Sequence, residues 1–285
     1  MISTQIQASH VDAAPSGPRP AVPAPPPRRP VEWRRALRAL RELLDDPDHT
    51  EKAFEVFLAL DGDEEEQRFQ RFLANPEGAR LAEQRPSLVD CLSDRAALKA
   101  LPAGSFGRAY LAYLDDTGFD PAGLVKLKAE MEAHSESIGE ALPVLDETRE
   151  WFRVRGLPTH DLWHVLTGYG TDDLGETLLL GFTCAQVGGR ANLLLLAGAS
   201  VRSIQNTGVG LAREIYRAWR RGRRAAWLAA LPYEELLAQP LDAVRARAGI
   251  EPADSAHPAG IPRGSRRDMS VPTMPAGVPT TGGRA

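Results

Sequence analysis

A long stretch of helical hydrophobic period, flanked by two proline-rich ends, is the feature that most constrains the fold of this chain. Between residues 31 and 250 the apolar residues recur every three or four positions, which is the spacing of one face of an α-helix. In residues 31–44, for example, Trp33, Leu37 and Leu40 fall on one stripe. We find no alternating strand pattern and no internal repeat. The sequence therefore predicts an all-α fold, with a single helical domain over residues 31–250.

The two ends have the composition of disordered tails. Residues 1–30 contain eight prolines, and residues 251–285 are rich in Pro, Gly, Ser and Thr without a hydrophobic period. Such segments cannot bury enough apolar surface to offset the entropy lost on ordering. We expect a disordered Pro-rich arm over residues 1–30 and a disordered tail over residues 251–285.

The overall composition disfavours several classes of protein. A net charge of −4 gives no reason to expect nucleic acid as a partner. Cys91 and Cys184 are far apart in the sequence, so we expect no disulfide framework and a reducing compartment. The first 20 residues lack the charged start and apolar core of a signal peptide.

The most apolar run, residues 178–199, approaches the roughly 20 residues of a membrane span. Gln186 and Arg190 lie in its middle, however, and a central Arg is costly in lipid. We therefore predict one buried helix over residues 172–199 and a second over residues 201–221.

A cluster of potential metal ligands lies in PTHDLWHVLTGYGTDDLGE, residues 158–176. On a helix, His160, Asp161 and His164 share a face about 100° wide. Glycines then turn the chain, and Glu176 falls in the first turn of the next helix. If the two helices pack side by side, two imidazoles and two carboxylates can surround a divalent transition metal.

The same residues also fit roles that involve no metal, or a different metal chemistry. A histidine pair at this spacing often only packs, Asp161 could cap its own helix, and Asp173 with Glu176 fits a capping box. Zinc peptidases have Glu where this chain has Asp161, because the longer side chain must reach the metal-bound water. A phosphohydrolase of the His-Asp type needs a separated upstream histidine, and only His134 is near. Both enzyme classes are therefore disfavoured.

The pattern His-Asp-x-x-His-x(11)-Glu resembles the signature of the Coq4 family of coenzyme Q biosynthesis. LPAGSFGRAY at residues 101–110, the Arg-rich approach at residues 146–169 and LPYEELLAQPLDAVRARAGI at residues 231–250 are also similar to family segments. The resemblance covers about residues 40–250 and is specific because the motifs occur in order. It implies an all-α fold with one divalent metal, usually zinc, held by the four residues His160, Asp161, His164 and Glu176.

The resemblance also implies a function in ubiquinone biosynthesis. The expected reaction is metal-dependent C1 decarboxylation of a polyprenylated 4-hydroxybenzoate-type intermediate, either alone or oxidative with C1 hydroxylation. Because zinc has no redox chemistry, iron or manganese would suit an oxidative step better. The alternative is a non-catalytic prenyl-lipid-binding scaffold that organises the other ubiquinone biosynthesis enzymes into a complex.

Further residues could serve these roles. Arg149, Arg153 and Arg155 are candidate binders of the substrate carboxylate, although they could simply be solvated. The small residues at 181, 185, 188 and 189 indicate either close helix packing or room for a prenyl tail. A homodimer is compatible with the sequence.

A basic segment at residues 212–227 could bind a membrane. It interleaves Tyr216, Trp219 and Trp227 with six arginines, Arg213, Arg217, Arg220, Arg221, Arg223 and Arg224. Such segments lie on anionic lipid, although a solvated helix end is equally compatible. We expect a protein of the bacterial cytoplasm, peripherally associated with the inner membrane.

Overall fold

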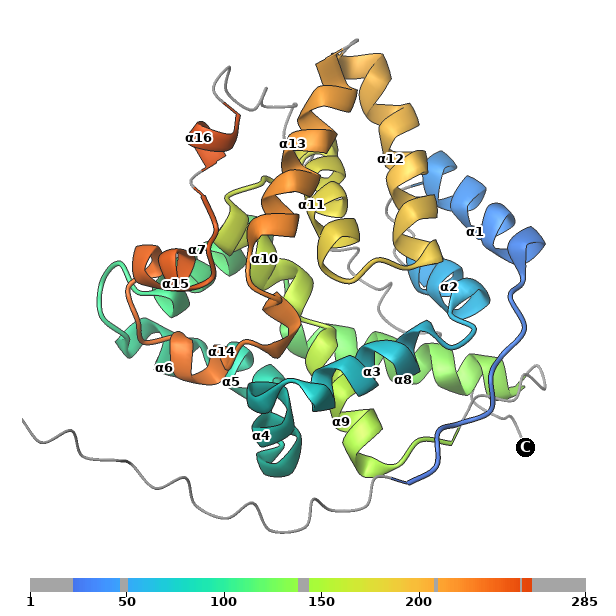
Figure 1. Ribbon diagram of the computed structural model, residues 1–285, viewed down its shortest axis with the longest axis horizontal. Coiled ribbons are helices and arrows are strands. Elements are labelled where there is room, and N and C mark those ends of the chain that lie inside the picture. The colour runs from blue at the N-terminus through green and yellow to red at the C-terminus, as the bar shows by residue number, and fades with distance from the viewer. Residues whose placement is uncertain (1–22, 47–50, 138–143, 208–209, 252, 258–285) are drawn as a thin grey trace, which may run out of the picture.

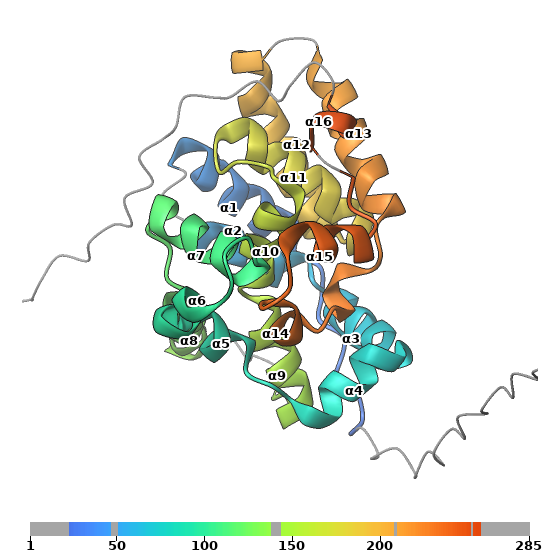
Figure 2. The ribbon, with the colours of Figure 1, turned by 90° about the vertical axis from the view of Figure 1, so that its left-hand side faces the viewer.

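The chain folds into packed α-helices, as the computed structural model shows for residues 23–46, 51–137, 144–207, 210–251 and 253–257 (Figures 1 and 2). These residues contain no strand, only an isolated bridge between Ser105 and Pro240, so the all-α prediction is confirmed. The longer helices are α1 (Trp33–Asp45), α2 (Glu51–Leu60), α3 (Glu64–Ala74), α4 (Pro76–Gln84), α7 (Phe106–Thr117), α8 (Pro121–Ser137), α9 (Glu147–Gly156), α10 (Thr159–Thr167), α11 (Asp173–Gln186), α12 (Arg190–Thr207) and α13 (Leu211–Arg224). The short ones are α5 (Leu88–Ser93), α6 (Arg95–Ala100), the 3₁₀ turn η2 (Leu228–Ala230), α14 (Tyr233–Leu236), α15 (Leu241–Arg247) and α16 (Ala253–Ala256).

Parts of the two predicted tails contact the helices. Residues 1–22 and 258–285 lie outside the described residues, so their disorder stays a prediction. Within the arm, the Arg29 N–H donates to the Gly62 carbonyl at 3.0 Å. Past residue 250, α16 forms and packs against α13. The buried side chain that holds this segment against the helices is His257, and the segment has no apolar stripe. Hydrophobic period therefore does not predict the short helix α16.

The predicted single helix over residues 172–199 is wrong, because the chain turns between α11 and α12. Gly188 and Gly189 have φ of +63° and +97°, values that glycine adopts without the strain of a Cβ. The polar side chains on either side of this turn find hydrogen-bond partners on other helices. The Gln186 amide donates to the Gly222 carbonyl at 2.7 Å, and the Arg190 guanidinium donates to the Leu60 carbonyl at 2.9 Å. Consequently α12 runs on to residue 207, and the helix predicted from residue 201 begins only at residue 211. Within the described part of the chain, no helix is long and apolar enough to cross a membrane.

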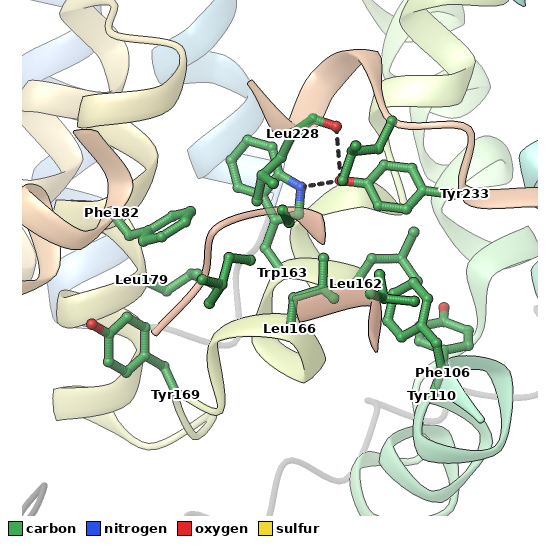
Figure 3. Close-up of a cluster of buried hydrophobic side chains, with 14 of the residues drawn as sticks. Phe106, Tyr110, Leu162, Trp163, Leu166, Tyr169, Leu179, Phe182, Leu228 and Tyr233 are labelled. Carbon is green, nitrogen blue, oxygen red and sulfur yellow. Dashed lines mark hydrogen bonds between the residues drawn. The ribbon is translucent and has the colours of Figure 1, made fainter. Parts of the chain in front are cut away.

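Helix α10 lies at the centre of the molecule in both views (Figures 1 and 2). Its Leu162, Trp163 and Leu166 are buried in the main hydrophobic cluster (Figure 3). The Trp163 indole N–H donates to the Tyr233 hydroxyl at 2.8 Å, and that hydroxyl donates to the Leu228 carbonyl at 2.9 Å. These contacts fix the rotation of α10 and hence the direction in which its histidines point.

Helices α1, α2 and α12 form a second hydrophobic cluster beside the first. It includes Ala36, Leu40, Val56, Leu60 and Leu195. The two clusters are joined through α12, which packs against α11 and α13 on one side and against α1 and α2 on the other. Residues of α1 and α2 line the same cavity as the predicted metal ligand Glu176 of α11.

We expect Gly222→Ala to destabilise the protein by about 1–3 kcal/mol, the usual range for overpacking. A Cβ at Gly222 would lie 2.6 Å from the Phe182 carbonyl oxygen and 2.9 Å from the Ala185 Cβ, where α11 and α13 pack closely. Urea unfolding measures the change. The control is Gly156→Ala at the end of α9, where the added Cβ meets nothing within 4 Å. Equal stability of Gly222→Ala and the wild type would contradict the close packing described.

Candidate metal centre

Three of the four predicted ligands converge. The Glu176 carboxylate lies 3.3 Å from the His160 Nε2 and 3.1 Å from the His164 Nε2, and the two Nε2 atoms are 3.1 Å apart. One donor atom from each residue lies within 4.8 Å of the others. Helix α10 supplies both histidines and the first turn of α11 supplies the glutamate, as the sequence predicts.

The turn between α10 and α11 positions Glu176. A Cβ at Gly175 would lie only 2.1 Å from the Gly170 carbonyl oxygen, so only glycine permits the turn to fold back this closely. Asp172 caps α11, because its carboxylate accepts from the N–H groups of Leu174 and Gly175, both at 3.0 Å. The capping-box alternative is therefore not used, and the Glu176 carboxylate faces the histidines.

A backbone carbonyl fixes the orientation of His164. Its Nδ1 lies 3.0 Å from the Tyr169 carbonyl oxygen. Because a carbonyl only accepts, Nδ1 must carry the proton, and the neutral ring presents its Nε2 lone pair toward His160 and Glu176. This arrangement of an imidazole between a metal position and a carbonyl is typical of histidine ligands.

Asp161, the fourth predicted ligand, lies outside the group of three and makes a different contact. Its Oδ1 accepts from the Tyr113 hydroxyl at 3.1 Å. Its Oδ2 is buried and has no hydrogen-bond partner among the described residues. A buried carboxylate oxygen without a partner is costly unless a cation or a proton satisfies it. Ligation by Asp161 therefore stays a prediction, and Tyr113 is a contact that no sequence pattern identifies.

The electrostatics of the group favour a cation. Burial raises the pKa of Asp161 to about 6, although the two histidines oppose this shift. Burial would also raise the pKa of Glu176, but the imidazoles of His164 and His160 outweigh it and lower that pKa below its usual range. For His164, burial favours the neutral ring, yet the Glu176 carboxylate raises its pKa. A proton or a divalent cation can supply the positive charge that these acceptors require, so the residues fit a divalent transition metal.

A large apolar cavity opens beside these ligands. Its volume is about 1020 Å³, at the top of the range of roughly 300–1,000 Å³ for small-molecule sites. His160, Asp161 and Glu176 form part of its lining. Its apolar walls come from α1, α2, α8, α11 and α12, and include Leu44, Phe57, Leu124, Leu127, Leu180 and Leu195.

The three candidate arginines are engaged by carboxylates of the chain itself. Arg149 is only 4% exposed, donates to Glu66 at 2.7 and 2.8 Å, and lies outside the cavity lining. Arg153 and Arg155 do line the cavity. Arg153 donates to both Glu65 oxygens, at 2.8 and 2.6 Å, and Arg155 pairs with the Glu234 carboxylate. Each of the three therefore makes an ion pair instead of being simply solvated, and their role as binders of the substrate carboxylate stays a prediction.

A comparison with known proteins identifies the family of this chain. The family described as "Coenzyme Q (ubiquinone) biosynthesis protein Coq4" matches residues 66–128 and 143–254, which is more than half of the chain. The chain belongs to the Coq4 family. The matched part contains all four predicted metal ligands, whereas α1, α2 and His257 lie outside it.

Individual relatives support the same assignment. The chain is 32% identical over 177 residues to the mitochondrial ubiquinone biosynthesis protein Coq4 homologue of Bos taurus, and 30% identical over 177 residues to that of Homo sapiens. It spans 62% of the length of each. A solved structure from Nostoc punctiforme, described as a "Putative ubiquinone biosynthesis protein", shares the fold with a TM-score of 0.54. The match covers 77% of this chain and 98% of that one, at 23% sequence identity.

We expect the Asp161→Asn variant to be more stable than the wild type at pH 7.5, by about 3 kcal/mol, when both are metal-free. The pKa of Asp161 is about 6 in the folded protein, against an ordinary value of 3.8. Stability contributed by the protonated group is therefore complete below pH 4 and is lost as the pH rises through 6. Asparagine cannot ionise and should remove this loss. Urea unfolding at pH 4.5 and 7.5 in the presence of a chelator tests this, and parallel pH dependences of the two proteins would contradict it.

Proposed function

We propose that this chain holds one divalent metal ion with His160, His164, Glu176 and Asp161, and that it decarboxylates C1 of a polyprenylated 4-hydroxybenzoate-type intermediate of ubiquinone. The observation that carries the proposal is the position of the ligand group at the wall of a large apolar cavity. Such a site suits a substrate with an anionic ring and a long apolar tail. The family membership supports the pathway, and the reaction is our proposal.

The substrate would lie with its ring at the ligand group and its tail along the apolar walls. Tail burial is favourable by about 25 cal/mol for each Å² of apolar surface removed from water. Because Arg149, Arg153 and Arg155 already pair with carboxylates of the chain, a bound metal would supply the positive charge for the substrate carboxylate. Arg153 and Arg155 would instead hold the cavity walls in place.

In a plain decarboxylation the bond between C1 and the carboxyl carbon breaks, its electron pair stays on C1, and a proton replaces the released CO2. The oxidative form places a hydroxyl group at C1 and needs an oxidant such as dioxygen. A bound divalent ion would supply Lewis-acid stabilisation of the charge that develops on the ring. Zinc is the metal implied by the family resemblance, whereas iron or manganese would suit the oxidative form.

The exposed face of α13 supports a peripheral position on a membrane. Tyr216 and Trp219 are 56% and 40% exposed and stack with ring centroids 6.0 Å apart. Arg220 and Arg223 lie over these two rings, at 5.9 and 5.8 Å from the centroids. Only Arg221, of the six arginines, is buried. Exposed aromatic and cationic groups on one helix face can rest on anionic lipid, from which the substrate would enter.

We expect His164→Ala and Glu176→Ala to abolish quinone synthesis in cells that depend on this protein. Each change removes a metal ligand and should lower metal affinity by more than the roughly 10- to 100-fold typical of changes to the partners of a ligand. Mass spectrometry of prenylated intermediates is the measurement, and the C1-carboxylated precursor should accumulate. The control is Glu83→Ala on the exposed side of α4. Normal quinone output from a folded, metal-free variant would contradict catalysis. If quinone is lost only when the other biosynthetic enzymes also dissociate, the result would favour the scaffold alternative.

We also expect Ala199→Trp to shorten the cavity and weaken binding of long-tailed ligands. Ala199 lies on α12 and lines the cavity, whereas Ala197 on the same helix is exposed and makes a matched control. Binding of prenylated 4-hydroxybenzoates should fall about 10-fold or more in Ala199→Trp for the longest tails only. Each methylene that the indole excludes from the cavity loses about 0.8 kcal/mol, so two excluded methylenes are enough. Equal affinities for long tails in the two tryptophan variants would contradict a tail in this cavity.

A further inference from the structure

The segment that follows the family match ends in a buried histidine. His257 comes directly after α16, is 1% exposed, and lies against α13. Its Nδ1 is 2.6 Å from a Glu214 carboxylate oxygen, and its Nε2 is 2.9 Å from the Tyr169 hydroxyl. A carboxylate only accepts, so Nδ1 donates to Glu214 and Nε2 accepts from the Tyr169 hydroxyl.

Tyr169 connects this histidine to the candidate metal centre. The Tyr169 backbone carbonyl accepts from the Nδ1 of His164, and the Tyr169 side chain contacts His257. A continuous chain of contacts therefore runs from Glu214 through His257 and Tyr169 to His164. We call Glu214, His257 and Tyr169 the C-terminal latch.

The surrounding contacts hold the same turn from the C-terminal half of the chain. Arg221 is buried, donates to the Thr167 carbonyl at 2.7 Å, and lies 5.1 Å from the centroid of the Tyr169 ring. Arg245 donates to the carbonyls of Val165 and Leu166, both at 3.0 Å. These cations satisfy the last carbonyl groups of α10 and suit the negative end of its dipole. The latch adds the contact that fixes the Tyr169 side chain itself.

We propose that His257 is a positioning residue for the metal centre: through Tyr169 it fixes the tautomer and the direction of the His164 ring. The inference rests on the proposed metal site. It assigns a role to a residue outside the part of the chain that matches the family. Mutation of a residue that hydrogen-bonds to a histidine ligand typically lowers metal affinity roughly 10- to 100-fold. His257 is one residue further from the metal position, so we expect its mutation to lower metal affinity about 10-fold.

The first experiment measures cobalt and zinc affinity of the full-length protein by chelator competition. We expect His257→Ala and Tyr169→Phe each to weaken binding about 10-fold, and the double variant to be no weaker than either, because both changes break the same chain of contacts. His257→Gln should restore most of the affinity, since its amide can donate to Glu214 and accept from Tyr169. Independent, additive effects of the two changes, or no rescue by glutamine, would overturn the proposal.

A matched variant separates positioning from a general loss of stability. Val244→Ala on α15 creates a cavity at a fully buried position that lies outside the latch. It should lower the melting temperature of the metal-free protein but leave cobalt affinity and the visible spectrum of the cobalt form unchanged. The His257→Ala spectrum should differ from the wild type, because the ligand direction changes. An equal loss of affinity in Val244→Ala would overturn the role of His257.

The second experiment does not require a metal. Nitrogen-15 spectra of the histidines in metal-free protein, taken in alkaline buffer where the rings are neutral, report which nitrogen of His164 carries the proton. The wild type and His257→Gln should show the Nδ1–H form, and His257→Ala a mixture of both forms. An unchanged Nδ1–H form in His257→Ala would overturn the latch. Failure of the wild type to bind cobalt would instead contradict the proposed metal site, so the two failures are distinguishable.

Discussion

The close approach of Gly175 to the backbone of Gly170 is the contact on which the geometry of the site depends. It allows the turn after α10 to fold back directly onto the first turn of α11. Glu176 therefore returns to the level of His160 and His164 instead of pointing along its own helix. A side chain at position 175 would separate the two helices and move the carboxylate out of reach of both imidazoles.

This convergence places electron-rich atoms together, with His164 and Asp161 buried and His160 and Glu176 partly exposed. Two imidazole nitrogens and a carboxylate lie within about 3.3 Å of one another, and a second carboxylate oxygen nearby has no partner among the described residues. Hydrophobic packing of Leu162, Trp163 and Leu166 on the other side of α10 must offset the cost. A site built this way is stable only with positive charge among its acceptors, which is the physical basis for expecting a cation.

Local patterns predict much of this arrangement, and contacts between distant segments account for the rest. The spacing of His160, His164 and Glu176 is a property of two consecutive helices, so one stretch of sequence is enough to predict it. Glu66 and Glu65, which accept from Arg149 and Arg153, lie 83 and 88 residues away on α3, a proximity that no local pattern encodes. Hydrophobic period does not reveal the break at residues 188 and 189, because apolar residues continue on both sides of it. The adjacent glycines Gly188 and Gly189 are the local signal that marks this turn. His257 follows a segment without such a period, so composition alone predicts a tail there.

The wall of the cavity has two origins within the chain. His160 and Glu176 belong to helices inside the family match, whereas two other lining residues, Leu44 of α1 and Phe57 of α2, precede it. Substitutions in α1 and α2 can therefore reshape the apolar part of the cavity without changing the ligands. The reactive end of such a site and the length of the molecule it accommodates can evolve separately, one under the constraint of coordination geometry and the other under that of apolar volume alone.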